Sequence, residues 1–231
     1  PQMSALPEHM VLKVVSEIHD PVTTTDELIP SGETSSFRSN PLGLAEFALS
    51  RKDPEYVGRA KEIQKAEKAI EVQECPVEAV PELQEVINVI KTKIPDFGVD
   101  ARTKPGFAGF GSTIFAVKPG DGSAREQAAS CQKVLGGWAN IAKEYATKRY
   151  RSNLINWGML PFVIDKDFDF DNDDYVFIPG IKDAVKNKTE VIKAYVVNKD
   201  FAEIELRLGE LTDDERQIIT DGCLINYYKY N

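Results

Sequence analysis

The second half of the chain alternates short apolar runs with amphipathic segments, and this order constrains the fold more than any other feature. A strand is predicted at Gly111–Val117, a helix at Ala124–Leu135 that ends at Gly136-Gly137, and a strand at Trp138–Ala142. Then follow a helix around Glu144–Trp157, strands near Leu160–Ile164, Tyr175–Ile178, Thr189–Val197 and Phe201–Leu208, and a helix over about Asp213–Tyr228 that starts with a capping box of Thr212 and Glu215. Strands that first alternate with helices and then follow one another predict a mixed α/β domain.

The first half of the chain is organised differently. Met10–Ile18 predicts a strand, and the polar segment 19–41 after it is long and irregular, as functional loops often are. Two helices are predicted at Pro54–Val72 and Pro81–Lys93, separated by Cys75-Pro76. We interpret residues 1–231 as a single domain, in which residues 1–20 lead in and residues 50–95 form a helical insertion.

Charge and composition argue against several classes of protein. There are 28 Lys and Arg residues against 37 Asp and Glu, and the net charge of −9 disfavours binding to nucleic acid or anionic lipid. No apolar run approaches the ~20 residues of a membrane span. The three cysteines, Cys75, Cys131 and Cys223, are too scattered for a disulfide framework or a self-contained metal site. We expect a soluble cytoplasmic chain, or a mitochondrial matrix chain in a eukaryote, and the start Pro1-Gln2-Met3 suggests a piece of a longer protein or a processed subunit.

The segment GDGSAREQAAS (residues 120–130) is the first candidate for chemistry. Ser123 and Glu126 fit a capping box, in which the serine side chain closes the start of a helix. The same segment places a hydroxyl, the guanidinium of Arg125 and free backbone N–H groups at a glycine-rich turn, which is a site for an anion. From these residues alone, both a cap and an anion site remain open.

Longer motifs resemble the C-terminal swivel domain of the aconitase family. GDGSAREQAASCQKVLGGWANIA (120–142) is similar to that family's G-x-G-S-S-R-E-H-A-A motif, helix and L-G-G-x-A element. NLINWGMLPF (153–162) resembles its N-L-x-x-x-G-L-L-P element, and VTTTDELIPSG (22–32) its T-T-D-H-I-S segment. DYVFIPGIKD (174–183) and TDDERQIITDGCLINYYK (212–229) extend the likeness over nearly the whole chain. The resemblance implies a swivelling β/β/α domain with a mixed sheet.

The resemblance also implies an activity, a cofactor and partners. The family isomerises citrate and isocitrate through cis-aconitate, by dehydration and rehydration, with a 4Fe-4S cluster whose three cysteine ligands lie on other domains. By position, Ser123 matches the serine base, Arg125 and Arg38 match arginines that bind substrate carboxylates, and Asp26 matches an active-site aspartate. A tricarboxylate substrate of the tricarboxylic acid cycle and the N-terminal iron–sulfur domains are then the expected partners, and the isolated chain is expected to be inactive.

Three departures leave the substrate open. Ala124 stands where the family usually has a second serine that helps hold the substrate, Gln127 follows Glu126 in place of a histidine, and Glu27 follows Asp26 in place of a histidine. A hydratase for a relative of citrate, such as methylisocitrate, therefore remains an alternative. So does the small subunit of an isopropylmalate isomerase, because TDELIP (25–30) is close to the T-D-x-I-I-P of such subunits. A non-enzymatic RNA-binding role is disfavoured by the negative charge.

Other polar clusters are interpreted as structural. DKDFDFDNDD (165–174) lacks the glycine and glutamate that a calcium loop needs, and we interpret it as a solvated acidic turn. KRYR (148–151) is interpreted as a solvated helix face. His9 and His19 both precede the motif region and are not assigned as acid or base, and Cys131 is expected to pack in the core.

Overall fold

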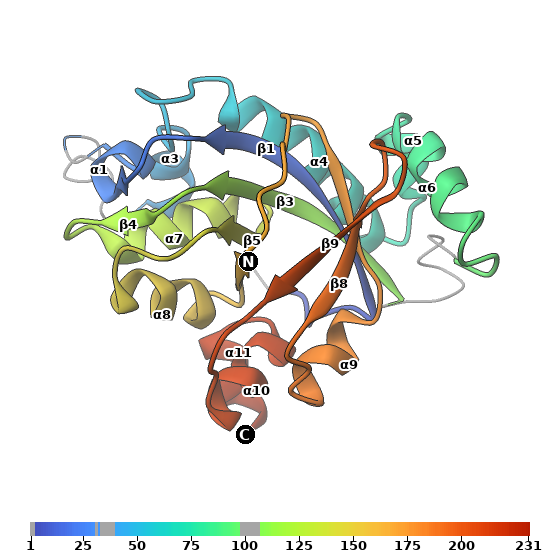
Figure 1. Cartoon of the computed structure of the whole chain (residues 1–231). Coiled ribbons are helices and arrows are strands. Elements are labelled where there is room, and N and C mark those ends of the chain that lie inside the picture. The colour runs from blue at the N-terminus through green and yellow to red at the C-terminus, as the bar shows by residue number, and fades with distance from the viewer. Residues whose placement is uncertain (1–2, 31, 33–39, 98–106) are drawn as a thin grey trace.

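Seven strands close into a barrel in the computed structural model, which describes residues 3–30, 32, 40–97 and 107–231 (Figure 1). The order around this barrel is β1-β3-β5-β6-β9-β8-β7, with β7 closing onto β1. β1, β3, β5 and β6 are parallel neighbours, and β7, β8 and β9 complete the barrel through antiparallel pairs. The strands are β1 His9–Ile18, β3 Ala108–Ala116, β5 Gly137–Ala142, β6 Leu160–Ile164, β7 Tyr175–Ile178, β8 Ile192–Val196 and β9 Ala202–Arg207.

Helices surround the barrel, and two short strands form a separate sheet beside it. The two strands are β2 Thr23–Thr24 and β4 Pro119–Asp121. The described helices are α1 Thr25–Leu28, α3 Pro41–Ala45, α4 Tyr56–Glu71, α5 Pro76–Ala79, α6 Leu83–Lys91, α7 Arg125–Val134, α8 Lys148–Asn156, α9 Ile181–Lys186, α10 Asp213–Asp221 and α11 Leu224–Tyr230. Each of these helices is too short or too polar to cross a membrane.

Alternation along the strands creates two cores. In β1, Met10, Leu12 and Val14 belong to a core cluster built mainly from barrel strands, while Val11 and Val15 belong to a cluster shared with the helices. Successive side chains of a strand point to opposite faces, so one buried strand serves both cores. The barrel is therefore filled by side chains on one face and covered by helices on the other.

The predicted mixed α/β order is confirmed, with several differences in detail. The last predicted helix is two helices, α10 and α11, because Gly222 adopts a left-handed conformation with φ of 106° between them. The helix expected from residue 144 begins at Lys148, where the Thr147 side chain caps it. α9 was not predicted, and neither were β2, α1 and α3, which give the segment expected to be irregular some regular structure, nor β4. The capping box of Thr212 and Glu215 is present as expected.

The helices predicted at 54–72 and 81–93 are present as α4 and α6, with the short α5 between them. α4 packs against β1 and β3 and buries Ala60, Ile63 and Ala66 in the core that it shares with the sheet. This helix is therefore part of the main core. That residues 50–95 form an insertion within a single domain stays a prediction.

Candidate active site

The candidate site lies where the carboxyl ends of two parallel strands meet. β1 and β3 end side by side, with Ile18 opposite Ala116, and the chain beyond them forms β2 and β4, which also pair in parallel. α1 follows β2 and α7 follows β4, so the beginnings of both helices lie at this edge (Figure 1). Ligands of α/β proteins commonly bind outside the carboxyl ends of the strands.

The predicted capping box of Ser123 and Glu126 is wrong. α7 begins at Arg125 with Ala124 as its N-cap, and no side chain caps it. The reason is geometric: Gly122 has φ of 133°, and the chain turns into the helix one residue later than predicted, so Ser123 precedes the capping position. Ser123 is exposed, and its hydroxyl makes no hydrogen bond within the described residues. The hydroxyl is therefore accessible to a ligand.

The first turn of α7 offers donors to an anion. The first N–H groups of a helix have no partner inside it, and no side chain among the described residues caps these. Arg125 lies in this turn, and its buried Nε has no hydrogen-bond partner in the described part of the chain. A buried donor of this kind requires an acceptor. A carboxylate that binds at this turn would supply one, and the positive end of the helix dipole would add to the attraction.

Asp26 lies on α1, next to the turn that carries Ser123. A Cβ atom added to Gly122 would overlap the Oγ1 of Thr25, so α1 and the turn are in direct contact. The Asp26 side chain is 53% exposed and lies 3.6 Å from Arg51. The structure thus brings Ser123, Ala124, Arg125 and the helix of Asp26 to one edge, while Arg38 lies outside the described residues.

Arg51 is a candidate residue that the sequence did not single out. It follows α3 in a segment that returns to α1, where the N–H of Leu49 donates to the carbonyl of Leu28 at 2.8 Å. This return places a cation beside Asp26, 25 positions earlier in the chain. The only sequence signal is the pair Arg51-Lys52 after α3, and a basic pair in a loop carries little information by itself.

The structure gives local roles to two of the three departures from the family pattern. Glu27 closes a capping box with Thr24: the Glu27 N–H donates to Thr24 Oγ1, and the Thr24 N–H donates to the Glu27 carboxylate, both at 3.1 Å. This box fixes the start of α1. Ala124 packs against the main core at the N-cap of α7. Nothing in the structure explains Gln127.

The cysteines of the chain do not form a metal site. Cys131 and Cys223 are buried, Cys75 is partly exposed, and all are free thiols. Burial raises the pKa of the Cys131 thiol to about 12, as suits its predicted place in the core. No group of three His, Cys, Asp or Glu residues among those described could hold a metal ion. These residues therefore do not fit an iron–sulfur cluster.

The carboxylates of the acidic run 165–174 are held by cations from other elements. Arg207 binds both oxygens of Asp165 at 2.7 and 2.8 Å, and Lys199 contacts Asp171 and the buried Asp174 at 2.8 and 2.9 Å. These ion pairs support the interpretation of an acidic turn. In KRYR, Tyr150 is buried and the Arg151 guanidinium donates to two backbone carbonyls, so only part of this segment is a solvated face.

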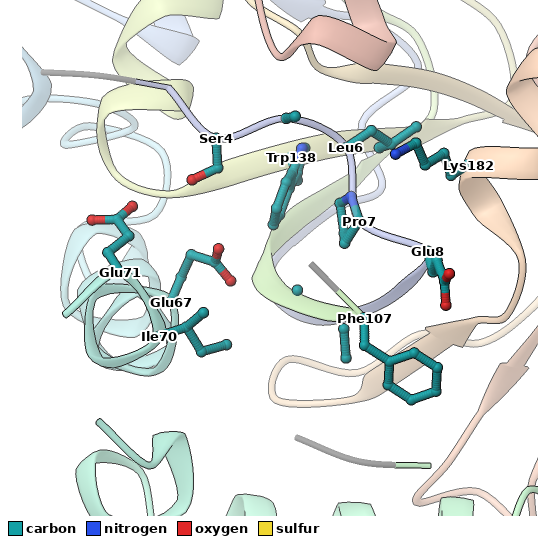
Figure 2. Close-up of a pocket in the computed structure, with 13 residues that line it drawn as sticks. Ser4, Leu6, Pro7, Glu8, Glu67, Ile70, Glu71, Phe107, Trp138 and Lys182 are labelled. Carbon is teal, nitrogen blue, oxygen red and sulfur yellow. The ribbon is translucent and has the colours of Figure 1, made fainter. Parts of the chain in front are cut away.

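A cavity of about 750 Å³ lies at the opposite, amino-terminal edge of the barrel (Figure 2). Residues 4–8, α4 and Trp138 line it, and none of the predicted site residues does. The Glu67 carboxyl lies at its wall and accepts from the N–H of Phe110 at 2.8 Å. Burial raises the pKa of Glu67 to about 7. This cavity is separate from the Ser123 turn, which comprises residues 120–124 before α7.

The comparisons with known proteins agree with the expected fold. Residues 101–167 match the family model of the aconitase C-terminal domain. Aconitate hydratase A of Rickettsia bellii is 31% identical over 132 residues, which are 53% of this chain and 15% of that protein. A probable mitochondrial aconitate hydratase of Dictyostelium discoideum is 31% identical over 116 residues, 48% of this chain and 14% of that protein. The matches thus span a small part of these relatives.

The fold is similar to that of a solved hydratase component. The crystal structure of 3-isopropylmalate dehydratase (leuD) from Methanocaldococcus jannaschii aligns with a TM-score of 0.56 and 21% identity, covering 96% of this chain and 95% of that one. The architecture is therefore of the aconitase swivel type, as expected from the sequence. The segment that matches the aconitase C-terminal domain includes Ser123 and Arg125, and the resemblance to the aconitase family is confirmed.

Proposed function

We propose that this chain is the swivel domain of a hydro-lyase that dehydrates and rehydrates a hydroxy-tricarboxylate, with citrate and isocitrate as the first candidates. One observation carries the proposal: the exposed Ser123 hydroxyl lies beside the N-terminus of α7 and Arg125, and within the described residues the hydroxyl, the helix start and the buried Nε of Arg125 have no side-chain partner. A base and an anion-binding site are thus next to each other. An aconitase-type reaction on a polycarboxylate requires this combination.

In this proposal Ser123 acts as the base. Its Oγ, in the alkoxide form, takes the proton from the substrate carbon, and the C–H electron pair becomes part of the new double bond; in the reverse direction Ser123 returns the proton. A serine alkoxide needs positive charge around it, which the N-terminus of α7 and Arg125 supply. Arg125, Arg38 and the free N–H groups bind substrate carboxylates, and Asp26 lies at the same edge.

The described residues contain no cluster ligands, so other domains or a large subunit would provide the 4Fe-4S cluster that assists loss of the hydroxyl. The chain alone is then expected to be inactive. Turnover by the isolated, metal-free chain would contradict this division of labour.

A second candidate is the small subunit of an isopropylmalate-isomerase-type hydratase. The segment TDELIP (25–30) and the fold of the leuD protein support it. The same Ser123 turn would serve either enzyme, since both substrates carry carboxylates. An open reading frame that continues upstream into cysteine-motif sequence favours the aconitase, and a separate start codon favours the subunit.

The test uses the complete enzyme with its iron–sulfur domains. Citrate, isocitrate, methylisocitrate and isopropylmalate are assayed, and Ser123→Ala is compared with Ser152→Ala, which removes an exposed hydroxyl on α8. We expect Ser123→Ala to lower kcat by roughly 10²- to 10⁴-fold with little change in KM, because a base acts in the transition state. The control should retain full activity. Unchanged kcat in Ser123→Ala would remove Ser123 as the base.

A further inference from the structure

Three polar side chains form a closed hydrogen-bonded ring beneath the Ser123 turn. Gln132 Nε2 donates to the hydroxyl of Tyr150 at 2.8 Å, the Tyr150 hydroxyl donates to Asn140 Oδ1 at 2.6 Å, and Asn140 Nδ2 donates to Gln132 Oε1 at 2.7 Å. All three residues are buried. Gln132 comes from α7, Asn140 from β5 and Tyr150 from α8, so the ring joins three separate elements.

The ring is fully satisfied, which matters because an unpaired polar group in a core is costly. The remaining amide hydrogens of Gln132 and Asn140 have acceptors in the carbonyls of Ala128 and Ala139, both at 3.0 Å. Burial raises the pKa of the Tyr150 phenol, so the hydroxyl stays protonated and keeps donating. Such a network stabilises one arrangement of its elements and penalises others.

The ring also reaches the turn that precedes Ser123. A Cβ added to Gly120 would lie 2.5 Å from Cβ and Cδ2 of Tyr150, so the backbone of Gly120 rests directly on the tyrosine side chain. Thr147 Oγ1 donates to the Gly120 carbonyl at 3.2 Å and accepts from the Tyr150 N–H at 3.1 Å. The N–H of Ala146 donates to the Pro119 carbonyl at 3.0 Å. β4 is therefore held on the N-terminus of α8.

We propose that Gln132, Asn140 and Tyr150 are positioning residues that hold the Ser123 turn and the first turn of α7 in one fixed relation. Tyr150 supports the chain before Ser123 through Gly120, and Gln132 anchors the helix after it. Asn140 ties both to the barrel. The proposal rests on the proposed function, because the relation matters only if Ser123 and Arg125 act on the same ligand.

The first test measures the position of the turn without activity. Tyr150→Phe keeps the aromatic side chain under Gly120 and removes only the hydroxyl, which breaks the hydrogen-bonded ring. Tyr195→Phe is the control, since the Tyr195 hydroxyl lies 3.5 Å from Glu203 in an exposed pair. In the complete enzyme, amide hydrogen exchange should become at least about tenfold faster over residues 119–127 in Tyr150→Phe. Exchange in β8 and β9 should not change, and the control should match the parent protein.

The second test separates positioning from stability. A triple variant combines Gln132→Met, Asn140→Leu and Tyr150→Phe. It replaces the whole hydrogen-bonded ring by apolar groups and leaves no member of the ring unpaired. Its melting temperature should therefore lie closer to that of the parent than the melting temperature of Tyr150→Phe does. Its kcat should remain lowered by roughly ten- to a hundredfold with KM changed less than threefold, because small misplacements of a catalytic group are costly. A purely structural role predicts recovery of kcat together with stability.

The outcomes are distinguishable. Unchanged exchange over residues 119–127 in both Tyr150→Phe and the triple variant would overturn the proposal even if the enzyme is a hydratase. Normal kcat in the triple variant would overturn it as well. If the parent enzyme turns over none of the four hydroxy acids, the proposed function fails, and the exchange data still decide whether the ring holds the turn.

Discussion

Gly122→Ala tests the contact between α1 and the Ser123 turn. Gly122 has φ of 133°, which side-chain-bearing residues rarely adopt, and this backbone costs about 1–3 kcal/mol for alanine. The new Cβ would also overlap Oγ1 of the buried Thr25, and forcing that side chain out of its rotamer costs about 0.5–1.5 kcal/mol. The lower entropy of unfolded alanine returns about 0.4–1 kcal/mol. The free energy of unfolding should therefore fall by roughly 2–3 kcal/mol.

The assay is thermal and denaturant unfolding followed by circular dichroism. For a chain of this size a loss of 2–3 kcal/mol lowers the melting temperature by roughly 4–12 °C. Thr25→Ala provides a matched background, because it removes Oγ1 and leaves only the backbone cost of Gly122→Ala. The double-mutant cycle should then give a coupling of about 0.5–1.5 kcal/mol.

A melting temperature within 2 °C of the parent value, or a coupling near zero, would refute this reasoning. The first result would mean that the turn tolerates a side chain at this φ. The second would mean that α1 does not press on Gly122, and that Asp26 and Ser123 are not held at one edge by this contact.

Two further predictions concern the charged groups. The pKa of Glu67 is raised from 4.5 to about 7 in the folded state. Between pH 4.5 and about 7 the folded state therefore holds a proton on Glu67 that the unfolded state has lost. The free energy of unfolding should then fall as the pH rises through this range. Glu67→Gln keeps an acceptor for the N–H of Phe110. The free energy of unfolding of this variant relative to the parent, measured in urea, should increase by roughly 2–3 kcal/mol from pH 4 to pH 8. Parallel pH curves of the two proteins would contradict this. Arg125→Lys keeps the charge but loses the guanidinium fork, so KM for the carboxylate substrate should rise roughly tenfold while the exposed Arg149→Lys leaves it unchanged. Equal KM values in the two variants would remove Arg125 from the binding site.

The sequence predicts most of the fold because its signals are local. β-branched runs mark the strands, and Thr212 with Glu215 marks a helix start through groups three residues apart. Closure of the barrel is not local: β7 pairs with β1 across more than 150 residues, and only tertiary packing decides this. The break at Gly222 is also tertiary, since a Cβ there would meet the backbone carbonyl of Ser4 at the other end of the chain.

The site is predictable only in part, because some of its contacts are tertiary and leave no local signal in the sequence. Gly122, Ser123 and Arg125 lie within four consecutive residues, so a motif can reveal them. Whether Ser123 caps the helix depends on one backbone turn: the pattern of serine and glutamate predicts Ser123 as the N-cap, and the structure has Ala124 there. Arg51 beside Asp26 depends on a chain return that leaves no periodic signal.

Ala124 connects the helix start to the chemistry. A serine at the N-cap would accept a hydrogen bond from an N–H of the first turn and satisfy it internally. Alanine cannot, and no other side chain of the described residues caps this turn, in which the Nε of Arg125 also lacks a described partner. In the proposed function, the departure from the family pattern would remove a side-chain contact to the substrate and leave a backbone donor in its place. Because a backbone N–H is fixed by the helix, this exchange favours recognition of a carboxylate over recognition of a hydroxyl at the same position.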